Sequence, residues 1–319
     1  MTIALDIVLA VLTVSLAVWT ILGRDPLDAV LGFIGMGVTI TLIWVRLASI
    51  DVALTEAAIG SGATGVLLLG AATLRQPDSP GTSDHAAGFV TRWLIVVLCC
   101  IVAVALAAAV LTLPDPAPSL AAEAVSNMTR LDLGNPVAAV LLGYRALDTF
   151  LEAVVLVLAL VGVWSLTPDP AWGGTGGRWN TDTRQDSLVF LARVLPPVGL
   201  LVGVHLAWTG AVAPGGAFQG GTVLAAMWML PMMAGLTRPP SVTAGWARAS
   251  VVVGPAVFLI AGLAGVWAAD GFLAYPPGME KPVILAIEAA LTLSIAVTLA
   301  LIIAGPATHL PSAIQASRQ

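Results

Sequence analysis

The chain has 319 residues, of which 58% are hydrophobic and only 10% are charged, and its formal net charge is −5. Soluble domains contain about 25% charged residues. The composition therefore excludes a soluble globular domain and predicts an all-α integral membrane protein, and the acidic balance gives no indication of nucleic-acid binding.

Apolar segments of about twenty residues recur along the chain, and each is long enough to cross a bilayer as a helix. The first lacks a basic flank and a small-residue cleavage site, so we interpret it as a retained helix rather than a signal peptide. A short helix at the membrane interface is expected over 136–147, before the fifth span. The nine expected spans are about 3–22, 27–46, 50–74, 91–113, 148–166, 188–211, 219–236, 249–269 and 282–304.

The polar segment 167–187 is expected to be a flexible linker between two modules, 1–166 and 188–319. Cys99 and Cys100 are adjacent in an apolar run, so they are expected to be buried thiols, without metal-site spacing and without a structural disulfide.

The distribution of basic residues predicts the orientation of the chain. With nine spans, one side of the membrane holds four of the 13 Lys and Arg residues and the other side holds the remaining nine. The four are Arg46, Arg130, Arg145 and Lys281. Because cytoplasmic loops are enriched in Lys and Arg, we expect a protein of the inner (plasma) membrane with its N-terminus outside and its C-terminus in the cytoplasm.

The third span carries two acids, Asp51 and Glu56. A carboxylate inside a span is by default a hypothesis for a functional site, because an unpaired charge in hydrocarbon is costly. Asp51 lies near the start of the helix, where a carboxylate suits the helix dipole and can cap, so a structural role is favoured for it. Glu56 lies about one and a half turns further and is not needed as a cap. It either titrates during function or is a fixed, hydrogen-bonded group.

Three glycines follow Glu56 in the same span, namely Gly60, Gly62 and Gly65. They remove side chains from one face of the helix, so that another helix can approach closely. They also weaken the local hydrogen-bond ladder, which favours a π-bulge or an inserted water molecule.

The segment YRALDTFLEAVVL places Arg145, Asp148 and Glu152 at the start of the fifth span. In a continuous helix all three can share one face. Two carboxylates on one face can hold a proton unless Arg145 offsets their charge. The alternative is an ordinary helix start in which Asp148 pairs with Arg145. That alternative is favoured for Asp148, whereas for Glu152 both stay open.

The last four spans contain a lone histidine, a glycine-rich turn and a further acid. His205 either relays protons or is simply hydrogen-bonded, and the second is favoured. Glu288 lies in the ninth span. The turn PGGAFQGG joins the sixth and seventh spans, and its backbone suits a sharp turn and close packing. Its Pro and Gly residues are Pro214, Gly215, Gly216, Gly220 and Gly221.

No nucleophile–base pair, metal-ligand spacing or nucleotide motif stands out, so we expect no enzyme active site, no metal and no cofactor. The candidate residues of an ion or proton path are Glu56, Asp148, Glu152, His205 and Glu288.

The stretch DVALTEAAIGSGATGVLLLGAATL (51–74) resembles the D-type (DUF4040) membrane subunit of membrane-bound hydrogenases. The same domain occurs in the C-terminal part of the large A subunit of Mrp-type Na⁺/H⁺ antiporters. The run D-A-TEA--G-G carries the resemblance. It also implies a likeness to the complex I subunit that has a π-bulged third helix.

The stretch 135–166 resembles the next, E-type module of that A subunit, whose usual core reads FRG-DT-GE. Arg145, Asp148, Thr149 and Glu152 match this core, whereas Tyr144, Ala146 and Leu151 depart from it. Residues 188–304 resemble the four-helix B subunit of the same antiporters through PGGAFQGG. That family usually reads PGGGF-GG preceded by His-Asn, and here Ala211 and Val212 lie near the place of the His-Asn.

Together these resemblances imply a fused D-, E- and B-type subunit of a multisubunit Mrp-type Na⁺/H⁺ antiporter. Such a subunit would help to form the ion path and would work with large antiporter-like subunits, lipids, Na⁺ and H⁺, without transporting alone. Two alternatives stay open. The chain is either a purely structural clamp between antiporter-like subunits, or a membrane subunit of an energy-converting hydrogenase or another redox complex related to complex I.

Overall fold

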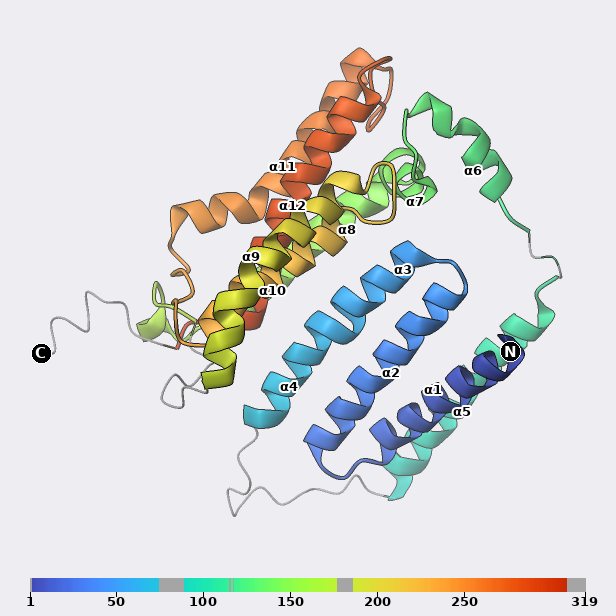
Figure 1. Ribbon diagram of the computed structural model, residues 1–319, viewed down its shortest axis with the longest axis vertical. Coiled ribbons are helices and arrows are strands. Elements are labelled where there is room, and N and C mark those ends of the chain that lie inside the picture. Colours follow the sequence, from blue (N-terminus) through green and yellow to red (C-terminus); the bar gives the residue numbers. More distant parts are fainter. Residues whose placement is uncertain (1, 75–88, 115, 117, 177–185, 309–319) are drawn as a thin grey trace, which may run out of the picture. The chain divides into compact units, whose positions relative to one another are not determined.

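The computed structural model of the chain describes residues 2–74, 89–114, 116, 118–176 and 186–308 (Figure 1). The chain forms two compact units, one made of Met1–Thr73 and Asn127–Gln319 and the other of Leu74–Ser126. Within the described ranges the secondary structure is helical, and extended pairing is limited to two isolated bridges, Thr175 with Ser241 and Gly176 with Ala307.

The helical elements are long apolar helices and several short turns of helix. In chain order they are α1 (Thr2–Leu22), α2 (Pro26–Arg46), α3 (Ile50–Thr55), the π-helix η1 (Glu56–Ala63), α4 (Thr64–Leu74), α5 (Phe89–Thr112), α6 (Ala121–Asn127), η2 (Met128–Arg130), α7 (Pro136–Ala139), the π-helix η3 (Val140–Tyr144), α8 (Ala146–Ser165), η4 (Asp169–Ala171), α9 (Asp186–Thr209), α10 (Ala217–Met233), α11 (Gly245–Ala268) and α12 (Glu280–Ala304).

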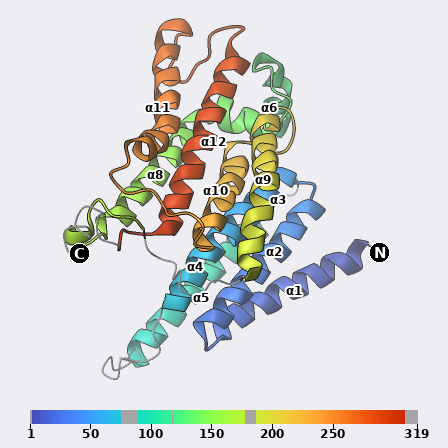
Figure 2. The same ribbon diagram turned by 60° about the vertical axis from the view of Figure 1, so that its left-hand side comes forward.

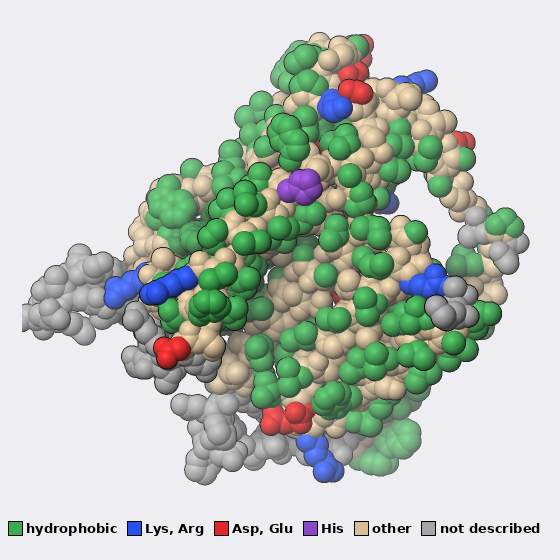
Figure 3. All heavy atoms as spheres, in the orientation of Figure 1, with side chains coloured by type: hydrophobic (Ala, Val, Ile, Leu, Met, Phe, Trp, Pro, Cys, Tyr) green, Lys and Arg blue, Asp and Glu red, His purple; other side chains and the backbone are tan. Residues whose placement is uncertain are grey.

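Each of the nine expected spans is a helix, with ends within a few residues of the expected ones, so the all-α membrane fold is confirmed. In the part of the chain that the structure describes, eight helices are long and apolar enough to cross a membrane, α3, η1 and α4 counting as one. The ninth, α10, has 17 residues and is largely buried between its neighbours. Hydrophobic side chains cover much of the surface visible in Figure 3, as contact with lipid requires.

The N-terminal hairpin consists of α1 and α2, and α2 packs in turn against α3 and η1. Asp25 caps α2 by accepting a hydrogen bond from the backbone N–H of Leu27, and Pro26 occupies the first turn, where its missing N–H costs nothing. An ion pair of 3.0 Å between Arg46 Nε and Asp6 Oδ1 ties the end of α2 to the start of α1. The two helices are therefore antiparallel neighbours.

The C-terminal bundle is organised around α12, which contacts α8, α10 and α11 (Figure 2). Two-thirds of its apolar window is buried, far more than in any other candidate span of the described residues. Its buried side chains include Ile284, Ile287, Leu291 and Ile295, which form one cluster with Phe258 of α11. Because the middle of α12 lies at the centre of its bundle, an ionisable group there, such as Glu288, is removed from both lipid and water.

Two expectations need correction. Residues 167–176 of the expected flexible linker are held by hydrogen bonds. Thr167 Oγ1 accepts the backbone N–H of Ala307, and Gly174 O accepts the backbone N–H of Val242. Residues 177–185 of the linker lie outside the described residues.

The two cysteines, expected to be buried, are exposed. Cys99 and Cys100 lie on α5, and the described residues of its own unit do not cover that helix.

The short helix expected over 136–147, before the fifth span, is present as α7 and η3. One side of it is buried, since Ala138, Ala139 and Leu142 belong to the same core cluster as Ile284 and Ile287 of α12.

Candidate functional site

The polar residues of three separate segments meet at the start of α3. Asp51 is buried, and its Oδ1 accepts two hydrogen bonds, one from the backbone N–H of Gly215 at 3.0 Å and one from Asn135 Nδ2 at 3.3 Å. The carboxylate of Asp51 makes these bonds to segments far along the chain rather than to the first amides of its own helix. The carboxylate therefore joins the D-type stretch to the glycine-rich turn and to the start of α7.

Asn135 connects the start of α7 to that turn. Its Oδ1 caps α7 by accepting the N–H of Val137 at 2.9 Å, while its Nδ2 donates to the carbonyl oxygens of Gly210 and Ala213, each at 3.0 Å. Its own backbone N–H donates to Ala211 O at 3.1 Å. A buried amide with this many partners holds three segments of the chain in one fixed arrangement.

The glycine-rich turn bends sharply, as the sequence predicts. Gly215 and Gly216 have φ values of +150° and +127°, which side chains other than hydrogen rarely allow. A Cβ built at Gly210 would lie 2.5 Å from the Cα of Gly216, so the two ends of the turn are in contact. The N–H of Gly216 donates back to Leu206 O of α9 at 2.9 Å.

Close packing explains the other two glycines of the motif. A Cβ at Gly220 would lie 2.6 Å from the carbonyl oxygen of Gly203, and one at Gly221 would lie 2.9 Å from Ile295 Cβ. The start of α10 therefore packs tightly against both α9 and α12, which confirms the close helix packing expected at these glycines.

Gln219, in the first turn of α10, reaches across to α3. It is buried, and its Nε2 donates to Thr55 Oγ1 at 3.0 Å, with the carbonyl oxygen of Asp51 3.5 Å away. Gln219 thus forms a second connection between α3 and the start of α10, one turn of α3 beyond Asp51.

Glu288 of α12 lies next to the glycine-rich turn. The residue is 4% exposed, and its Oε2 has no hydrogen-bond partner among the described residues. Its Oε1 lies 3.2 Å from the position that a Cβ of Gly210 would take and 3.8 Å from that of Gly216. The carboxylate therefore lies against the same glycine turn whose Gly215 N–H is bound by Asp51.

Tyr275 lies in the loop between α11 and α12, close enough to Glu288 to be affected by its charge. Burial, and to a smaller extent the carboxylate of Glu288, raise the pKa of the Tyr275 hydroxyl. That hydroxyl donates to Leu142 O of η3 at 2.5 Å. The Tyr275 hydroxyl is therefore a hydrogen-bond donor with a fixed partner.

Glu56 is the first residue of the π-helix η1, so the π-bulge expected in the third span is confirmed. Its carboxylate folds back over the helix, since a Cβ at Gly60 would lie 2.5 Å from Glu56 Oε1 and one at Gly37 of α2 would lie 3.2 Å from it. Gly60 and Gly37 thus make room for the acid between two helices. The π-helix also leaves backbone groups for hydroxyl donors, such as Ser61 Oγ, which donates to Glu56 O at 3.2 Å.

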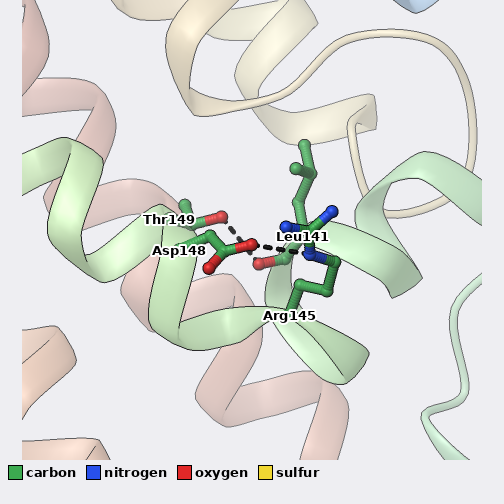
Figure 4. A network of polar contacts seen from close by, with 4 residues as sticks. All are labelled: Leu141, Arg145, Asp148 and Thr149. Atoms are coloured by element: carbon green, nitrogen blue, oxygen red, sulfur yellow. Dashed lines mark hydrogen bonds and ion pairs between the residues drawn. The ribbon is translucent and has the colours of Figure 1, made fainter.

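Of the three residues expected to cluster at the start of α8, Arg145 and Asp148 form an ion pair and Glu152 does not take part in it. Arg145 stands between η3 and α8, with φ −126° and ψ 35°, and its Nε pairs with Asp148 Oδ2 at 2.6 Å (Figure 4). Arg145 is exposed, Asp148 is half-exposed, and Glu152 is exposed one turn further on. The favoured pairing of Asp148 with Arg145 is therefore confirmed.

His205 is exposed on α9 and is not brought together with the buried acids. The structure thus gathers Asp51, the glycine turn and Glu288 in one place, with Glu56 a helical turn beyond Asp51. Asp148, Glu152 and His205 instead lie on the outside of the described chain.

Sequence reasoning missed Asn135, Gln219, Thr55 and Tyr275 as members of this site. Two of them carry a signal that was available. Asn135 precedes Pro136 at a helix start, which is typical of a cap, and Gln219 is the polar side chain of PGGAFQGG. Thr55 and Tyr275 carry no such signal, because their partners lie far away in the sequence.

These features define a polytopic, all-α membrane protein with a buried polar junction between its two halves. Residues 11–76 match the family MbhD, described as the D subunit of MBH. Residues 187–308 match the family MnhB, described as "Domain related to MnhB subunit of Na+/H+ antiporter". Two models of different subunits therefore match separate parts of this one chain. A search of curated proteins gives no match.

Two solved structures share the fold. One is the Mrp complex from Dietzia sp. DQ12-45-1b, with a TM-score of 0.72 and 23% identity over 95% of this chain. This chain spans 35% of the length of that one. The other is the membrane-bound sulfane sulfur reductase, an archaeal respiratory membrane complex, with a TM-score of 0.52 and 20% identity over 67% of this chain and 98% of that one.

Proposed function

We propose that this chain is an integral membrane subunit of a multisubunit Mrp-type Na⁺/H⁺ antiporter, to whose assembly and ion path it contributes. The observation that carries the proposal is the union of a D-type and a B-type domain in one chain, joined by buried hydrogen bonds from Asp51 and Gln219. A junction built from buried polar groups is costly unless every group is paired, so it favours one fixed arrangement of the two domains.

The nine-span topology supports this arrangement. It assigns the start of the third span, the start of α7, the glycine turn and the start of α12 to the same side of the membrane. Those segments meet in the structure through Asp51, Asn135 and Gly215, and through an ion pair of 3.5 Å between Lys281 and Asp132. The proposed orientation puts this side outside the cell, because most Lys and Arg residues fall on the other side.

Partner subunits are proposed from the ionisable groups that the chain leaves exposed. Glu152 on α8 and His205 on α9 are exposed within apolar helices, and an ionisable group facing lipid is costly. We assign these surfaces to contacts with other subunits, including the large antiporter-like ones. At these contacts, Glu152 and Asp148 would continue an ion path that starts at Glu56.

The test is complementation of the whole complex. The genes of the complex, with and without this chain, are expressed in cells that lack their own Na⁺/H⁺ antiporters, and Na⁺-dependent collapse of the pH gradient is measured in everted vesicles. We expect exchange only when the chain is present. Exchange at the full rate without the chain would contradict the proposal.

A second candidate is a membrane subunit of a redox-driven complex. It is favoured by the match of the D-type domain to the MbhD family and by the shared fold with the sulfane sulfur reductase complex. Purifying the intact complex and identifying its subunits separates the two, because a redox complex must also contain subunits that hold electron-transfer cofactors.

The third candidate function, a purely structural clamp between other subunits, is tested with the variant Glu56→Gln. A clamp tolerates loss of the charge as long as the shape is kept.

A further inference from the structure

We propose that Glu288 is a proton-binding site of the B-type domain, connected to the D-type stretch through Gln219 across the space left by Gly216. The role of this site in exchange rests on the function proposed above. Its ability to take up and release a proton does not. Two independent observations carry the proposal, namely the unpartnered carboxylate oxygen and the polar path that leads away from it.

The unpartnered oxygen is the first observation. Glu288 is 4% exposed at the centre of the C-terminal bundle, and its Oε2 has no hydrogen-bond partner in the described ranges. An ionised carboxylate buried without a partner is costly, whereas a protonated one needs only a single acceptor. No Lys or Arg makes an ion pair with Glu288 in the described part of the chain. A neutral acid is the state that fits such surroundings.

The polar path is the second observation. A Cβ at Gly216 would lie 3.3 Å from Gln219 Oε1 and 3.8 Å from Glu288 Oε1, so both oxygens border the space that the missing side chain leaves. Gln219 Nε2 in turn donates to Thr55 Oγ1 of α3. A water molecule in the space beside Gly216 would accept a hydrogen bond from the protonated carboxyl group of Glu288 and would donate one to the amide oxygen of Gln219.

The donors around Glu288 suit a proton better than a metal cation. The neighbouring carbonyl oxygens of Leu206, Gly210 and Gly216 each already accept a hydrogen bond. The described residues also contain no group of three or more His, Cys, Asp or Glu side chains that could hold a metal ion. Glu288 therefore offers a single carboxylate rather than a coordination shell.

Few other ionisable groups face Glu288. Tyr275 is the neighbour whose titration its charge affects, and Asp51 lies beyond the glycine turn. The elements packed against α12 add little. The helix α10 has no ionisable side chain, Arg248 on α11 and Glu152 on α8 are exposed, and so are Asp186, Arg193 and His205 on α9. Asp148 on α8 is half-exposed and paired with Arg145. A proton that titrates inside this bundle can therefore be assigned to Glu288.

The direct test is infrared difference spectroscopy of the full chain in lipid nanodiscs during a pH titration. We expect a carboxylic-acid carbonyl band that titrates in the wild type, is lost in Glu288→Gln and is displaced in Glu288→Asp. The matched control is Asp270→Asn, because Asp270 is exposed in the α11–α12 loop at a positive φ that Asn tolerates. A titrating band that persists unchanged in Glu288→Gln overturns the proposal.

The second readout is exchange by the assembled complex. We expect Glu288→Gln to assemble in normal yield and to slow Na⁺-dependent proton exchange by about tenfold or more, while Asp270→Asn has no effect. A normal rate in an assembled Glu288→Gln complex overturns the role in exchange. If the wild-type complex itself shows no exchange, the proposed function fails, and the infrared titration still decides whether Glu288 binds a proton.

Discussion

Asp51 Oδ1 accepts the backbone N–H of Gly215 at 3.0 Å, across a sequence separation of 164 residues. The same oxygen receives the side-chain amide of Asn135, so a single carboxylate oxygen holds both the glycine turn and the start of α7. Because Gly215 has a positive φ, the direction of its N–H depends on a backbone conformation that other residues rarely adopt. The hydrogen bond and the glycine therefore depend on each other.

Asp51→Ala is expected to destabilise the chain by about 1–3 kcal/mol, because it leaves the buried N–H of Gly215 without a partner. Asp51→Asn keeps an acceptor oxygen and should cost less. Thermal unfolding of the purified chain, followed by tryptophan fluorescence, measures both. The double variant with Asn135→Ala should cost less than the sum of the single variants, since the two residues share one network. Strict additivity would show that Asp51 and Asn135 act independently.

Gly220→Leu is expected to prevent assembly of the complex. The new side chain would start 2.6 Å from the carbonyl oxygen of Gly203 and would force α9 and α10 apart. The matched control is Gly162→Leu on α8, because a Cβ at Gly162 meets nothing within 4 Å. Co-purification of partner subunits on an affinity tag reports assembly. Equal yields for the two variants would show that the tight contact is not needed.

Glu56→Gln is expected to assemble normally and to lose most Na⁺/H⁺ exchange. Glutamine keeps the shape of the side chain between Gly37 and Gly60 but cannot ionise. Glu56→Asp should retain part of the activity. Rates are measured in vesicles across a range of pH, with Asp270→Asn as the control for loss of an exposed acid. A wild-type rate at every pH would make Glu56 structural and would favour the clamp.

Thr149→Val is expected to destabilise the chain more than Asp148→Asn. The hydroxyl of Thr149 is buried and donates to Leu141 O at 2.7 Å, where it ties α8 to the π-helix before it (Figure 4). Removing such a buried hydrogen bond costs about 1 kcal/mol or more. The exposed Arg145–Asp148 pair is worth about 0.2–1 kcal/mol. The same unfolding measurement ranks the two variants, and the reverse order would be inconsistent with the burial of Thr149.

The chain alone, reconstituted into liposomes, is expected to show no Na⁺-dependent collapse of a pH gradient. The acids Glu56 and Glu288 have no basic partner in the described ion pairs, and Glu152 faces outwards, so a continuous path requires other subunits. The intact complex in the same liposomes is the positive control. Exchange by the lone chain would show that it contains a complete path.

The sequence alone determines the helices and several local features of this protein. Nine apolar segments must become helices, because a backbone inside hydrocarbon has to satisfy its own hydrogen bonds. Gly60, Gly62 and Gly65 after Glu56 indicate the π-helix, because they weaken the local ladder. The sharp turn at Gly215 and Gly216 and the pairing of Arg145 with Asp148 are likewise local, and the structure confirms them.

Only the tertiary structure decides which of the acids are buried together. A hydrophobic pattern says that a helix crosses the membrane but not which face meets a neighbour, since lipid and protein interior are both apolar. The sequence therefore could not separate Glu288, which lies at the centre of a bundle, from Glu152, which faces outwards. It also could not show that Asp51 binds Gly215, because that contact depends on how α3 packs against α10, and packing is decided by the shapes of surfaces that are far apart in the chain.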